Sequence, residues 1–326
     1  MHPVLVSGAA GFIGYRFVER CRKEGIPVVS VDAREHFMAR PEHRDLDTGA
    51  IVDRHELFDW LGAAPRALTG IVHLGACTDT TETDEKLFTR DNVEYSQRLW
   101  TYATERQVPF VYASSAATYG DGTLSYDDDE SVIPRLQPLN AYGRSKQAFD
   151  RWVLQQGSTP PAWSGWKFFN VYGYGERHKG HMASVVMHAF DQRWAGGPIR
   201  LFRSHRAGIA DGHQARDFIA VSDVISVLMF ALTKPVARGI RNLGTGTART
   251  YLDLARGVCR ALGKSEKIEF VDTPITIRDK YQYFTQARMT RLRDEGYREP
   301  FTTLEAGIAS YVGALVDEAV RDRLPV

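Results

Sequence analysis

The chain has little of several features that would place it in a specialised class. It has 3 cysteines in 326 residues, Cys21, Cys77 and Cys259, with no Cys-x-x-Cys spacing. A disulfide framework is therefore not expected, and we predict small core residues in a reduced cytoplasm. No apolar run approaches the roughly 20 residues that span a bilayer. Met1-His2-Pro3 leads into a predicted strand without a signal peptide.

The chain also lacks a strong charge of either sign. Its formal net charge is +1, which gives no long-range field for nucleic acid or an anionic membrane. We expect neither as a partner, so an anionic ligand must be bound by local Arg and Lys side chains. The 43% hydrophobic and 25% charged contents are those of an ordinary globular protein. Its length allows a large core and two lobes.

Strand-like and helix-like segments alternate through the first half of the chain. Expected strands cover 3–7, 27–32, 70–75, 109–115 and 165–171, and expected helices cover 12–24, 54–61, 84–106 and 140–156. This alternation is typical of an α/β protein with a doubly wound parallel sheet. Later segments are a helix near 181–195, a strand at 199–202, a polar loop at 203–216, a strand at 216–221 and a helix at 222–233.

The C-terminal region predicts one further helix. Thr302-Thr303-Leu304-Glu305 reads as a capping box at its start. The apolar face expected for this helix contains Leu304, Ile308, Tyr311, Val312 and Leu315. The spacing of these residues predicts one buried stripe.

The first predicted strand, Val4-Leu5-Val6, runs directly into a glycine-rich turn and a helix. Gly8 permits the tight turn, Gly11 leaves room for phosphate oxygens, and Gly14 lets the helix pack close to the strand. The helix N-terminus adds free N–H groups and partial positive charge. Asp32, at the end of the next predicted strand, can bind a ribose hydroxyl pair. These features together predict a dinucleotide site.

Tyr142 and Lys146 lie four residues apart, on one face of a predicted helix. A phenol with its ordinary pKa of about 10 is a poor base at neutral pH. We predict that the Lys146 ammonium and an oxidised nicotinamide lower the pKa of Tyr142. Ser115, at the preceding strand end, can polarise a substrate oxygen. The pattern favours Ser–Tyr–Lys redox chemistry, and the alternative is an amphipathic tyrosine beside a solvated lysine.

A series of segments resembles the extended short-chain dehydrogenase/reductases, over essentially the whole chain. In chain order they are GAAGFIG, HLGAC, YASSAATYG, YGRSK, FFNVYG, RDF and NLGTG. The resemblance implies a Rossmann sheet and nucleotide-sugar chemistry. Sugar 4,6-dehydratases of this branch look like Thr-Asp-Glu where this chain has Ser115-Ala116-Ala117. Oxidation and reduction without loss of water is therefore favoured.

Residues 173–185 and 280–287 are similar to signatures of the ADP-glycero-manno-heptose 6-epimerases, a family within this branch. The resemblance implies an isomerase that converts ADP-D-glycero-D-manno-heptose to ADP-L-glycero-D-manno-heptose for the lipopolysaccharide core. One tightly bound NADP per subunit would oxidise carbon 6 to a transient ketone and re-reduce it on the opposite face. A second acid–base group is then needed, and the resemblance assigns Lys179 to it, besides Ser115, Tyr142 and Lys146.

The resemblance also assigns domains and an assembly state. Residues 1–171 plus about 216–245 would form the NADP-binding Rossmann domain. Residues of about 172–215 and 246–326 would form a smaller α/β domain for the ADP-sugar. Members of the family form ring-like homo-oligomers, such as a pentamer, so we expect an oligomer here.

Matching positions give the expected binding residues. Those for the cofactor are Gly8, Gly11, Phe12, Ile13, Gly14, Asp32, Ala33, Arg54, Leu74, Gly75, Ala76, Cys77, Thr78, Asn92, Tyr142, Lys146, Val171 and Lys179. Those for the substrate are Asn170, His181, His188, Phe202, Arg203, Ser204, His205, Arg216 and Tyr281. A guanidinium such as that of Arg216 matches diphosphate oxygens.

Several alternatives stay open. Asp32 by itself favours NAD, because a carboxylate repels a 2′-phosphate. Arg34 and Arg54 can neutralise that phosphate, and the resemblance favours NADP, which we expect. Arg216 could instead form a surface ion pair with Asp217, and His188 could be a core or capping histidine. No metal is expected, because no carboxylate or cysteine completes a set with the histidines at 178, 181 and 188.

Two rival functions also remain. A UDP-sugar 4-epimerase would share the serine and the Tyr-x-x-x-Lys pair but would not need Lys179. A non-catalytic dinucleotide sensor would commonly lose Tyr142 or Lys146, and this chain has both. The sequence leaves the role of the loop 205–215 open.

Overall fold

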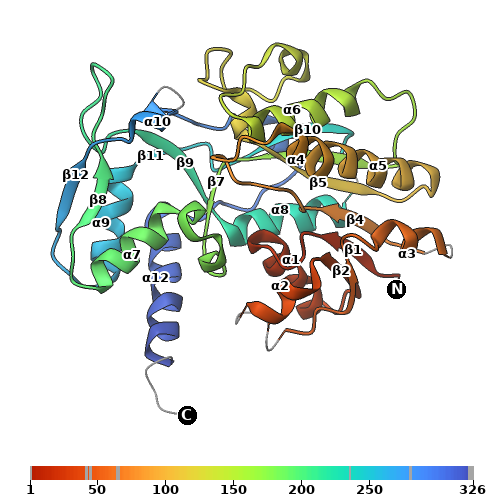
Figure 1. Ribbon diagram of the computed structural model, residues 1–326, viewed down its shortest axis with the longest axis horizontal. Helices are drawn as coiled ribbons and strands as arrows, with labels where there is room; N and C mark the ends of the chain where they lie inside the picture. Colours follow the sequence, from red (N-terminus) through yellow and green to blue (C-terminus); the bar gives the residue numbers. More distant parts are fainter. Residues whose placement is uncertain are drawn as a thin grey trace. The chain divides into compact units, whose positions relative to one another are not determined.

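The computed structural model describes residues 2–40, 43, 46–63, 67–234, 236–278 and 281–321 (Figure 1). The chain forms two compact units. Unit 1 contains Met1–Phe168, Val224–Leu243 and Thr290–Arg298, and unit 2 contains Phe169–Asp223, Gly244–Met289 and Glu299–Val326. These units differ from the expected domains in two segments. The strand from residue 215 belongs to unit 2, because it pairs within a separate small sheet, and residues 290–298 belong to unit 1.

A seven-stranded sheet forms the centre of unit 1, in the order β10-β6-β5-β4-β1-β2-β3. Its strands are β1 Val4–Ser7, β2 Val28–Asp32, β3 Ala50–Asp53, β4 Gly70–His73, β5 Phe110–Ser115, β6 Trp163–Phe168 and β10 Gly239–Leu243. All neighbouring strands are parallel. The residues of β1, β5 and β10 are all buried, as expected for a sheet covered on both faces. The predicted doubly wound parallel sheet is confirmed.

Helices cover both faces of this sheet, with α4, α5 and α6 on one side and α1 and α8 on the other (Figure 1). The α-helices with residues in unit 1 are α1 Phe12–Lys23, α2 Arg34–Ala39, α3 Leu57–Ala63, α4 Glu85–Phe88, α5 Tyr95–Glu105, α6 Ala141–Leu154, α8 Val221–Thr233 and α11 Thr290–Asp294. A π-helical turn, η2 Thr89–Glu94, joins α4 to α5, and 3₁₀ turns cover η3 Ala116–Tyr119 and η4 Glu130–Arg135. Sequence reasoning missed β3 and α2, which are only four and six residues long.

The late segment Thr290–Arg298 completes unit 1 around β10. Arg291 Nη1 donates to the Ile240 carbonyl oxygen at 2.9 Å and lies 3.1 Å from Glu130 Oε1. The Arg241 side chain is fully buried and its Nε donates to Glu295 Oε2 at 2.6 Å. The last strand of the sheet is therefore held by residues about fifty positions further along the chain.

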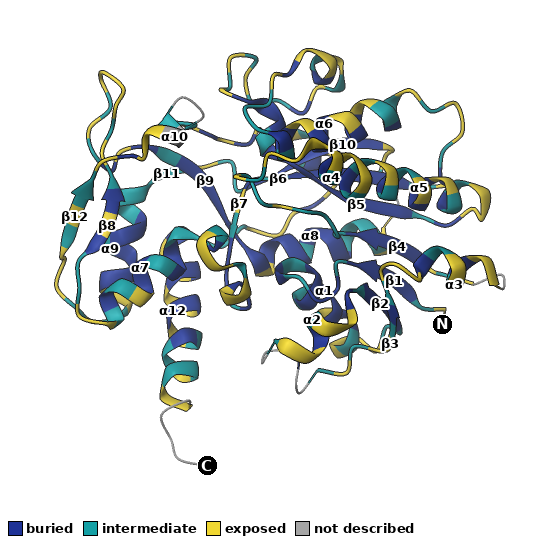
Figure 2. Cartoon of the chain, in the orientation of Figure 1, coloured by how far each residue is buried: buried dark blue, intermediate teal, exposed yellow. Residues whose placement is uncertain are grey.

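Unit 2 contains two small sheets. The strands β7 Asn170–Tyr172, β9 Ala215–Ala220 and β11 Ala248–Thr250 form one, and β8 Ile199–Phe202 pairs with β12 Ile268–Val271 in the other. Its helical elements are η5 Arg177–Met182, α7 Val185–Trp194, α9 Tyr251–Ala261, α10 Ile275–Arg278 and α12 Leu304–Arg321. Buried faces of α7, α9 and α12 share one apolar core (Figure 2). The strand predicted at 165–171 is divided at Phe169, because β6 and β7 belong to different sheets.

The C-terminal helix confirms one prediction and corrects another. Leu304, Ile308, Tyr311, Val312 and Leu315 are all buried, as its spacing predicted. The capping box at 302–305 is wrong. Thr303 caps the helix by accepting from the Ala306 N–H at 3.3 Å, whereas Thr302 binds Asp223 and Glu305 binds Arg249. Among the described helices, none is both long and apolar enough to cross a membrane.

Candidate active site

The glycine turn at the end of β1 is built by close backbone approach. Gly8 has φ +71°, and a Cβ there would lie 2.5 Å from the Gly75 nitrogen. A Cβ on Gly14 would lie 2.0 Å from the Gly8 carbonyl oxygen, so the predicted close packing of helix on strand is confirmed. Phe12 is buried at the first position of α1, next to Ile13. This turn with α1 behind it is a cradle that fits a pyrophosphate.

Asp32 lies at the carboxyl end of β2 and is bonded to the glycine turn. Its carboxylate accepts from the Ala10 N–H at 3.0 Å and from the Ala33 N–H at 2.9 Å, and it lies 3.0 Å from His36 Nδ1. These bonds hold the carboxylate at the edge where a Rossmann sheet presents its ribose ligand. The arrangement fits the adenosine half of a dinucleotide.

Two arginines flank this carboxylate in the chain. The exposed Arg34 lies 3.0 Å from Glu56 in an ion pair between two exposed groups, a type of pair that contributes little to stability. Arg54 follows Asp53, which is in register with Asp32 in the sheet. The backbone N–H of Arg54 donates to the Asp32 carbonyl oxygen at 3.1 Å, and its side chain is exposed beside His55.

The loop after β4 contains five predicted cofactor positions, Leu74, Gly75, Ala76, Cys77 and Thr78. Asn92, buried in the π-helical turn, exchanges hydrogen bonds with the Cys77 backbone at 2.8 and 2.9 Å and donates to Ser145 Oγ at 2.9 Å. Asn92 therefore holds this loop against α6. Its predicted cofactor contact stays a prediction. Cys77 is only half-buried, unlike Cys21 and Cys259, so it is not the core residue that we expected.

A buried histidine beneath this loop was not predicted. His73 Nδ1 lies 2.5 Å from Ser7 Oγ, and its Nε2 lies 2.8 Å from Ser96 Oγ. Ser7 Oγ also accepts from the Gly75 N–H at 3.3 Å. Burial, and then the charge of Lys146, lower the pKa of His73 to about 3, so it is neutral at physiological pH. A lone histidine within a strand motif carries no signal that would reveal this bridge between β1 and α5.

Ser115, Tyr142 and Lys146 come together at the carboxyl end of β5. A hydrogen bond to Ser115 favours the ionised phenol, but burial has the larger effect and raises the pKa of Tyr142. The predicted lowering of this pKa by Lys146 is therefore not found in the protein itself. Lys146 Nζ itself donates to the Ala113 carbonyl oxygen at 2.9 Å. Lys146 is 6% exposed, so the solvated-lysine alternative is wrong.

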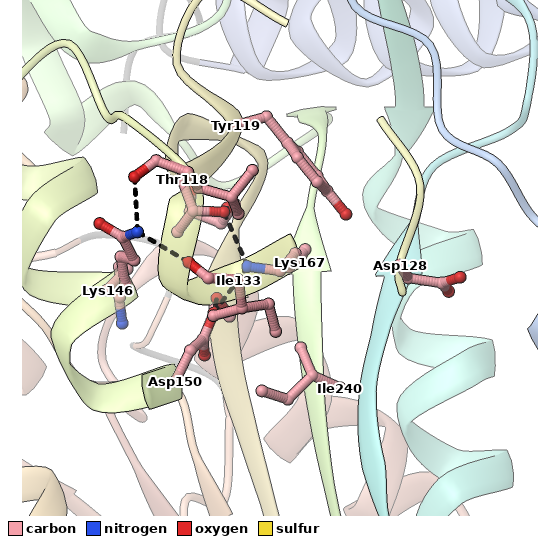
Figure 3. A network of polar contacts seen from close by, with 12 residues as sticks. Thr118, Tyr119, Asp128, Ile133, Lys146, Asp150, Lys167 and Ile240 are labelled. Atoms are coloured by element: carbon pink, nitrogen blue, oxygen red, sulfur yellow. Dashed lines mark hydrogen bonds and ion pairs between the residues drawn. The ribbon is translucent and has the colours of Figure 1, made fainter. Parts of the chain in front are cut away.

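Burial lowers the pKa of Lys146 to about 8, although the carboxylate of Asp150 opposes this effect. Asp150 lies one helical turn beyond Lys146 and is the centre of a buried polar network (Figure 3). Its Oδ2 lies 2.6 Å from Lys167 Nζ, and both side chains are 0% exposed. Lys167 Nζ also donates to Thr118 Oγ1 at 2.7 Å, and Ser114 Oγ donates to Asp150 Oδ2 at 2.7 Å. This network holds α6 against β5 and β6.

Unit 2 places Lys179 in a short turn between β7 and α7. The turn η5 covers Arg177–Met182 and contains Gly180 at φ +55°. The Lys179 backbone N–H donates to the Glu176 carbonyl oxygen at 3.0 Å, and Lys179 Nζ lies 3.7 Å from Glu176 Oε2. Glu176 is a buried residue that sequence reasoning missed. Its position three residues before Lys179 is the signal that could have found it.

A second cluster in unit 2 brings Phe202, Arg216 and Tyr281 together. The Phe202 and Tyr281 rings are 6.2 Å apart, and the Arg216 guanidinium lies 5.3 Å from the Tyr281 ring centroid. Arg216 is buried and donates to the carbonyl oxygens of Ala215, at 3.0 Å, and Gln282. Tyr251, 5.7 Å from Arg216, is a further member that we did not predict.

Asp217 does not pair with its neighbour Arg216, so the surface ion-pair alternative is wrong. Its buried carboxylate accepts from the backbone N–H groups of Thr245, Gly246 and Ala287 at 2.7, 2.9 and 3.0 Å. Burial raises the pKa of Asp217, and these hydrogen bonds oppose that effect. Asp217 therefore holds the two loops that flank β9.

The remaining predicted residues of unit 2 lie on several elements. Asn170 and Val171 are on β7, His181 is exposed on η5, and His188 is half-buried on α7. Ser204, whose N–H donates to Asp211 Oδ1 at 2.8 Å, and His205, whose N–H donates to the Tyr283 hydroxyl at 3.0 Å, begin the loop after β8. Arg203 lies 3.7 Å from both Asp211 and Asp272. Lys280 of the predicted signature lies outside the described residues.

No group of three or more His, Cys, Asp or Glu side chains arranged for a metal occurs in the described part of the chain. Each of the two units has its own set of side chains that could contact a ligand. Unit 1 has a dinucleotide cradle with a serine, a tyrosine and a lysine, and unit 2 has a lysine turn and an arginine–aromatic cluster.

Known proteins are similar to this chain in sequence and in fold. Residues 4–244 match the profile of the NAD dependent epimerase/dehydratase family. ADP-L-glycero-D-manno-heptose-6-epimerase of Fusobacterium nucleatum subsp. nucleatum is 40% identical over 95% of this chain and 96% of its own length. The solved structure of the Helicobacter pylori ADP-L-glycero-D-manno-heptose-6-epimerase has a TM-score of 0.79 and 25% identity, covering 97% and 96% of the two chains.

A further solved structure is MoeE5 in complex with UDP-glucuronic acid and NAD, with 26% identity, a TM-score of 0.77 and 97% and 99% coverage. The fold and the family profile define an epimerase or dehydratase that uses a nicotinamide dinucleotide. Within that class, the chain belongs to the ADP-L-glycero-D-manno-heptose-6-epimerase family.

Proposed function

We propose that the protein inverts carbon 6 of ADP-glycero-manno-heptose, converting the D-glycero to the L-glycero epimer for lipopolysaccharide core synthesis. Family membership over almost the full chain, together with a positioned Ser115–Tyr142–Lys146 set, carries the proposal. A nicotinamide bound at the cradle of unit 1 supplies the redox chemistry at carbon 6. The carbon loses and regains one hydrogen, so no external oxidant or reductant is consumed.

The side chains of this protein handle the proton of the carbon 6 hydroxyl. In one epimer Tyr142 takes this proton as the alcohol becomes a ketone, with Ser115 bonded to the same oxygen. The re-formed alkoxide of the other epimer points elsewhere, because the exocyclic carbon has rotated. It receives its proton from Lys179. Each of Tyr142 and Lys179 therefore serves one epimer.

We propose NADP as the cofactor. Asp32 is already bonded to Ala10 and Ala33, so it is held in place for the adenosine ribose. The exposed Arg54 side chain beside it offers a cation for a 2′-phosphate. Comparing the affinities of cofactor-free protein for NADP⁺ and NAD⁺ tests this assignment, and a strong preference for NAD⁺ would overturn it.

The cluster of Phe202, Arg216 and Tyr281 is the proposed contact for the ADP half of the substrate. Stacking on the aromatic rings suits adenine, and the guanidinium suits the diphosphate. Asn170, His181, His188, Arg203, Ser204 and His205 are proposed to complete the substrate site. A cytoplasmic homo-oligomer is the proposed working form.

The decisive experiment replaces the two proposed acid–base groups separately. Tyr142→Phe and Lys179→Met are each expected to lower kcat for epimerisation by roughly 10²–10⁴-fold, with unchanged Tm and bound cofactor. Near-normal turnover in Lys179→Met would rule out the two-base account. Parallel incubation with ADP-heptose and UDP-galactose separates the proposal from a UDP-sugar 4-epimerase, which would convert only the second.

A further inference from the structure

Glu176 is a buried carboxylate at the junction of three elements of unit 2. It is 0% exposed, between the end of β7 and the start of η5. Its Oε2 accepts from the Ser184 N–H at 2.8 Å, and its Oε1 accepts from Ser184 Oγ at 2.5 Å and from the Gly173 N–H at 3.4 Å. Because Ser184 is the N-cap of α7, the carboxylate fixes where that helix begins relative to β7.

The C-terminal helix places Tyr311 near the same carboxylate. The Tyr311 hydroxyl donates to Met187 Sδ at 3.6 Å, and burial, then the negative charge of Glu176, raises its pKa. Tyr311 lies on α12, whose buried face packs in the same core as α7. Glu176 therefore lies near the β7–η5 loop, α7 and α12, and accepts hydrogen bonds from the first two.

Lys179 is the cation that faces this carboxylate. Its ammonium lies 3.7 Å from Glu176 Oε2, one turn further along the chain, and its side chain is 27% exposed. This distance is that of an ion pair and is longer than a normal hydrogen bond. A buried carboxylate attracts a nearby cation strongly, because little water screens the pair. The Lys179 side chain is therefore held by the charge of Glu176 while remaining partly exposed to solvent.

Another charged group near the turn, Arg177, lies 3.2 Å from Asp191 of α7 and 3.7 Å from Glu318 of α12. Glu176 is an acidic group within ion-pair distance of the Lys179 ammonium. His178 and His181 lie in the same turn and are exposed.

We propose that Glu176 is a positioning residue for the second acid–base group, holding the Lys179 ammonium in place for one epimer of the substrate. This proposal rests on the proposed function of Lys179. The backbone bonds of the same carboxylate fix the ends of η5, and its charge fixes the lysine side chain. Tyr142, on a separate helix in unit 1, does not depend on it.

The two epimers distinguish this role from general support of the fold. The enzyme with its cofactor bound is mixed in a single turnover with each purified carbon 6 epimer, and the absorbance of reduced nicotinamide is recorded. In Glu176→Gln, which keeps the size but loses the charge, oxidation of one epimer is expected to slow by about tenfold or more, since small misplacements of reacting groups are costly. Oxidation of the other epimer, which uses Tyr142, is expected to stay within about threefold.

Three companion variants make each outcome decisive. Lys179→Met must show the same one-sided loss, and near-normal turnover there would refute the proposed function instead. Ser184→Ala removes a hydrogen bond without removing charge, and its effect should be small and equal for both epimers. If Glu176→Gln does not fold, Glu176→Asp carries the test, with a smaller loss on the same side. Equal losses for both epimers, or none, overturn the role of Glu176.

Discussion

The two proposed acid–base groups are held in place in very different ways. Tyr142 and Lys146 lie on α6, a helix of 14 residues that begins at the Asn140 cap. The fully buried pair of Asp150 and Lys167 fixes that helix to the sheet. Lys179 lies in a turn of 6 residues that contains Gly180 at positive φ, and its ammonium lies 3.7 Å from the buried Glu176 carboxylate.

The proposed reaction therefore combines one acid–base group on a well-packed helix with another in a short turn. Hydrogen bonds connect α6 to β5, β6 and the π-helical turn η2, so the Asp150–Lys167 pair is one of several contacts that hold Tyr142 in place. The Lys179 ammonium lies in a short turn beside the Glu176 carboxylate, so we expect single substitutions there to move it. The predictions below test this difference, from the largest expected effect to the smallest.

The largest effect is expected at the buried pair behind α6. Asp150→Asn leaves Lys167 as an uncompensated buried charge, and we expect the free energy of unfolding to fall by about 3–5 kcal/mol. Denaturant unfolding measures this directly. The matched control is the double variant Asp150→Leu with Lys167→Met, which removes both charges. Its free energy of unfolding should fall much less. If the single and double variants are equally unstable, the pair is not what holds α6.

A smaller change in the free energy of unfolding, of opposite sign, is expected on replacing Lys146. Burial lowers the pKa of Lys146 to about 8. Below that pH the Lys146 ammonium is charged in both the folded and the unfolded protein, and burying this charge on folding costs stability. Between about pH 8 and pH 10.5, the ordinary value, the unfolded state binds more protons, so stability rises with pH.

Lys146→Met should therefore raise the free energy of unfolding at pH 7 by ~1–3 kcal/mol while abolishing turnover. The difference between the two proteins should shrink as the pH rises toward 10. Unfolding curves recorded at several pH values test this. A difference in stability between the two proteins that stays constant across this pH range would contradict a cost of burying the Lys146 charge.

The smallest effect on stability is expected in the lysine turn. In Gly180→Ala, the added Cβ has no atom within 4 Å, but the residue must keep φ at +55°. We therefore expect the free energy of unfolding to fall by ~1 kcal/mol. Gly196→Ala, just beyond the C-terminus of α7, has φ +86° and is equally open, which makes it a matched control. Both variants should lose a few degrees of Tm, but only Gly180→Ala should slow epimerisation. Equal activity in the two would show that the turn tolerates distortion.

Unit 1 could be predicted from the sequence far better than unit 2. The apolar runs at Val4-Leu5-Val6 and Phe110–Ala113 are buried strands whose ends place Gly8 and Ser115. Their signals are local, since a strand and a turn are adjacent in the chain. In unit 2, β7 and β9 pair across more than forty residues, and no local pattern showed that the strand would divide at Phe169.

Buried charges were the main omission in the site. Asp150, Lys167, Glu176 and Asp217 each resemble a solvated side chain in the sequence, and the structure shows all four as buried and bonded. Some of their partners lie far away in the chain, such as Ala287 for Asp217, whereas Glu176 is bonded to the nearby Ser184. The misplaced capping box has the same origin. Thr302 has the right spacing to cap α12, but its N–H and hydroxyl both donate to Asp223 instead.

The return of Thr290–Arg298 to unit 1 has a consequence for biosynthesis. Because Arg291 and Glu295 bond to the edge strand β10, that strand gains these bonds only after residues 291–295 have been synthesised. Domains of many proteins fold during translation, N-terminal one first. In this protein, a chain that ends before residue 291 would leave the buried Arg241 on the edge strand without Glu295.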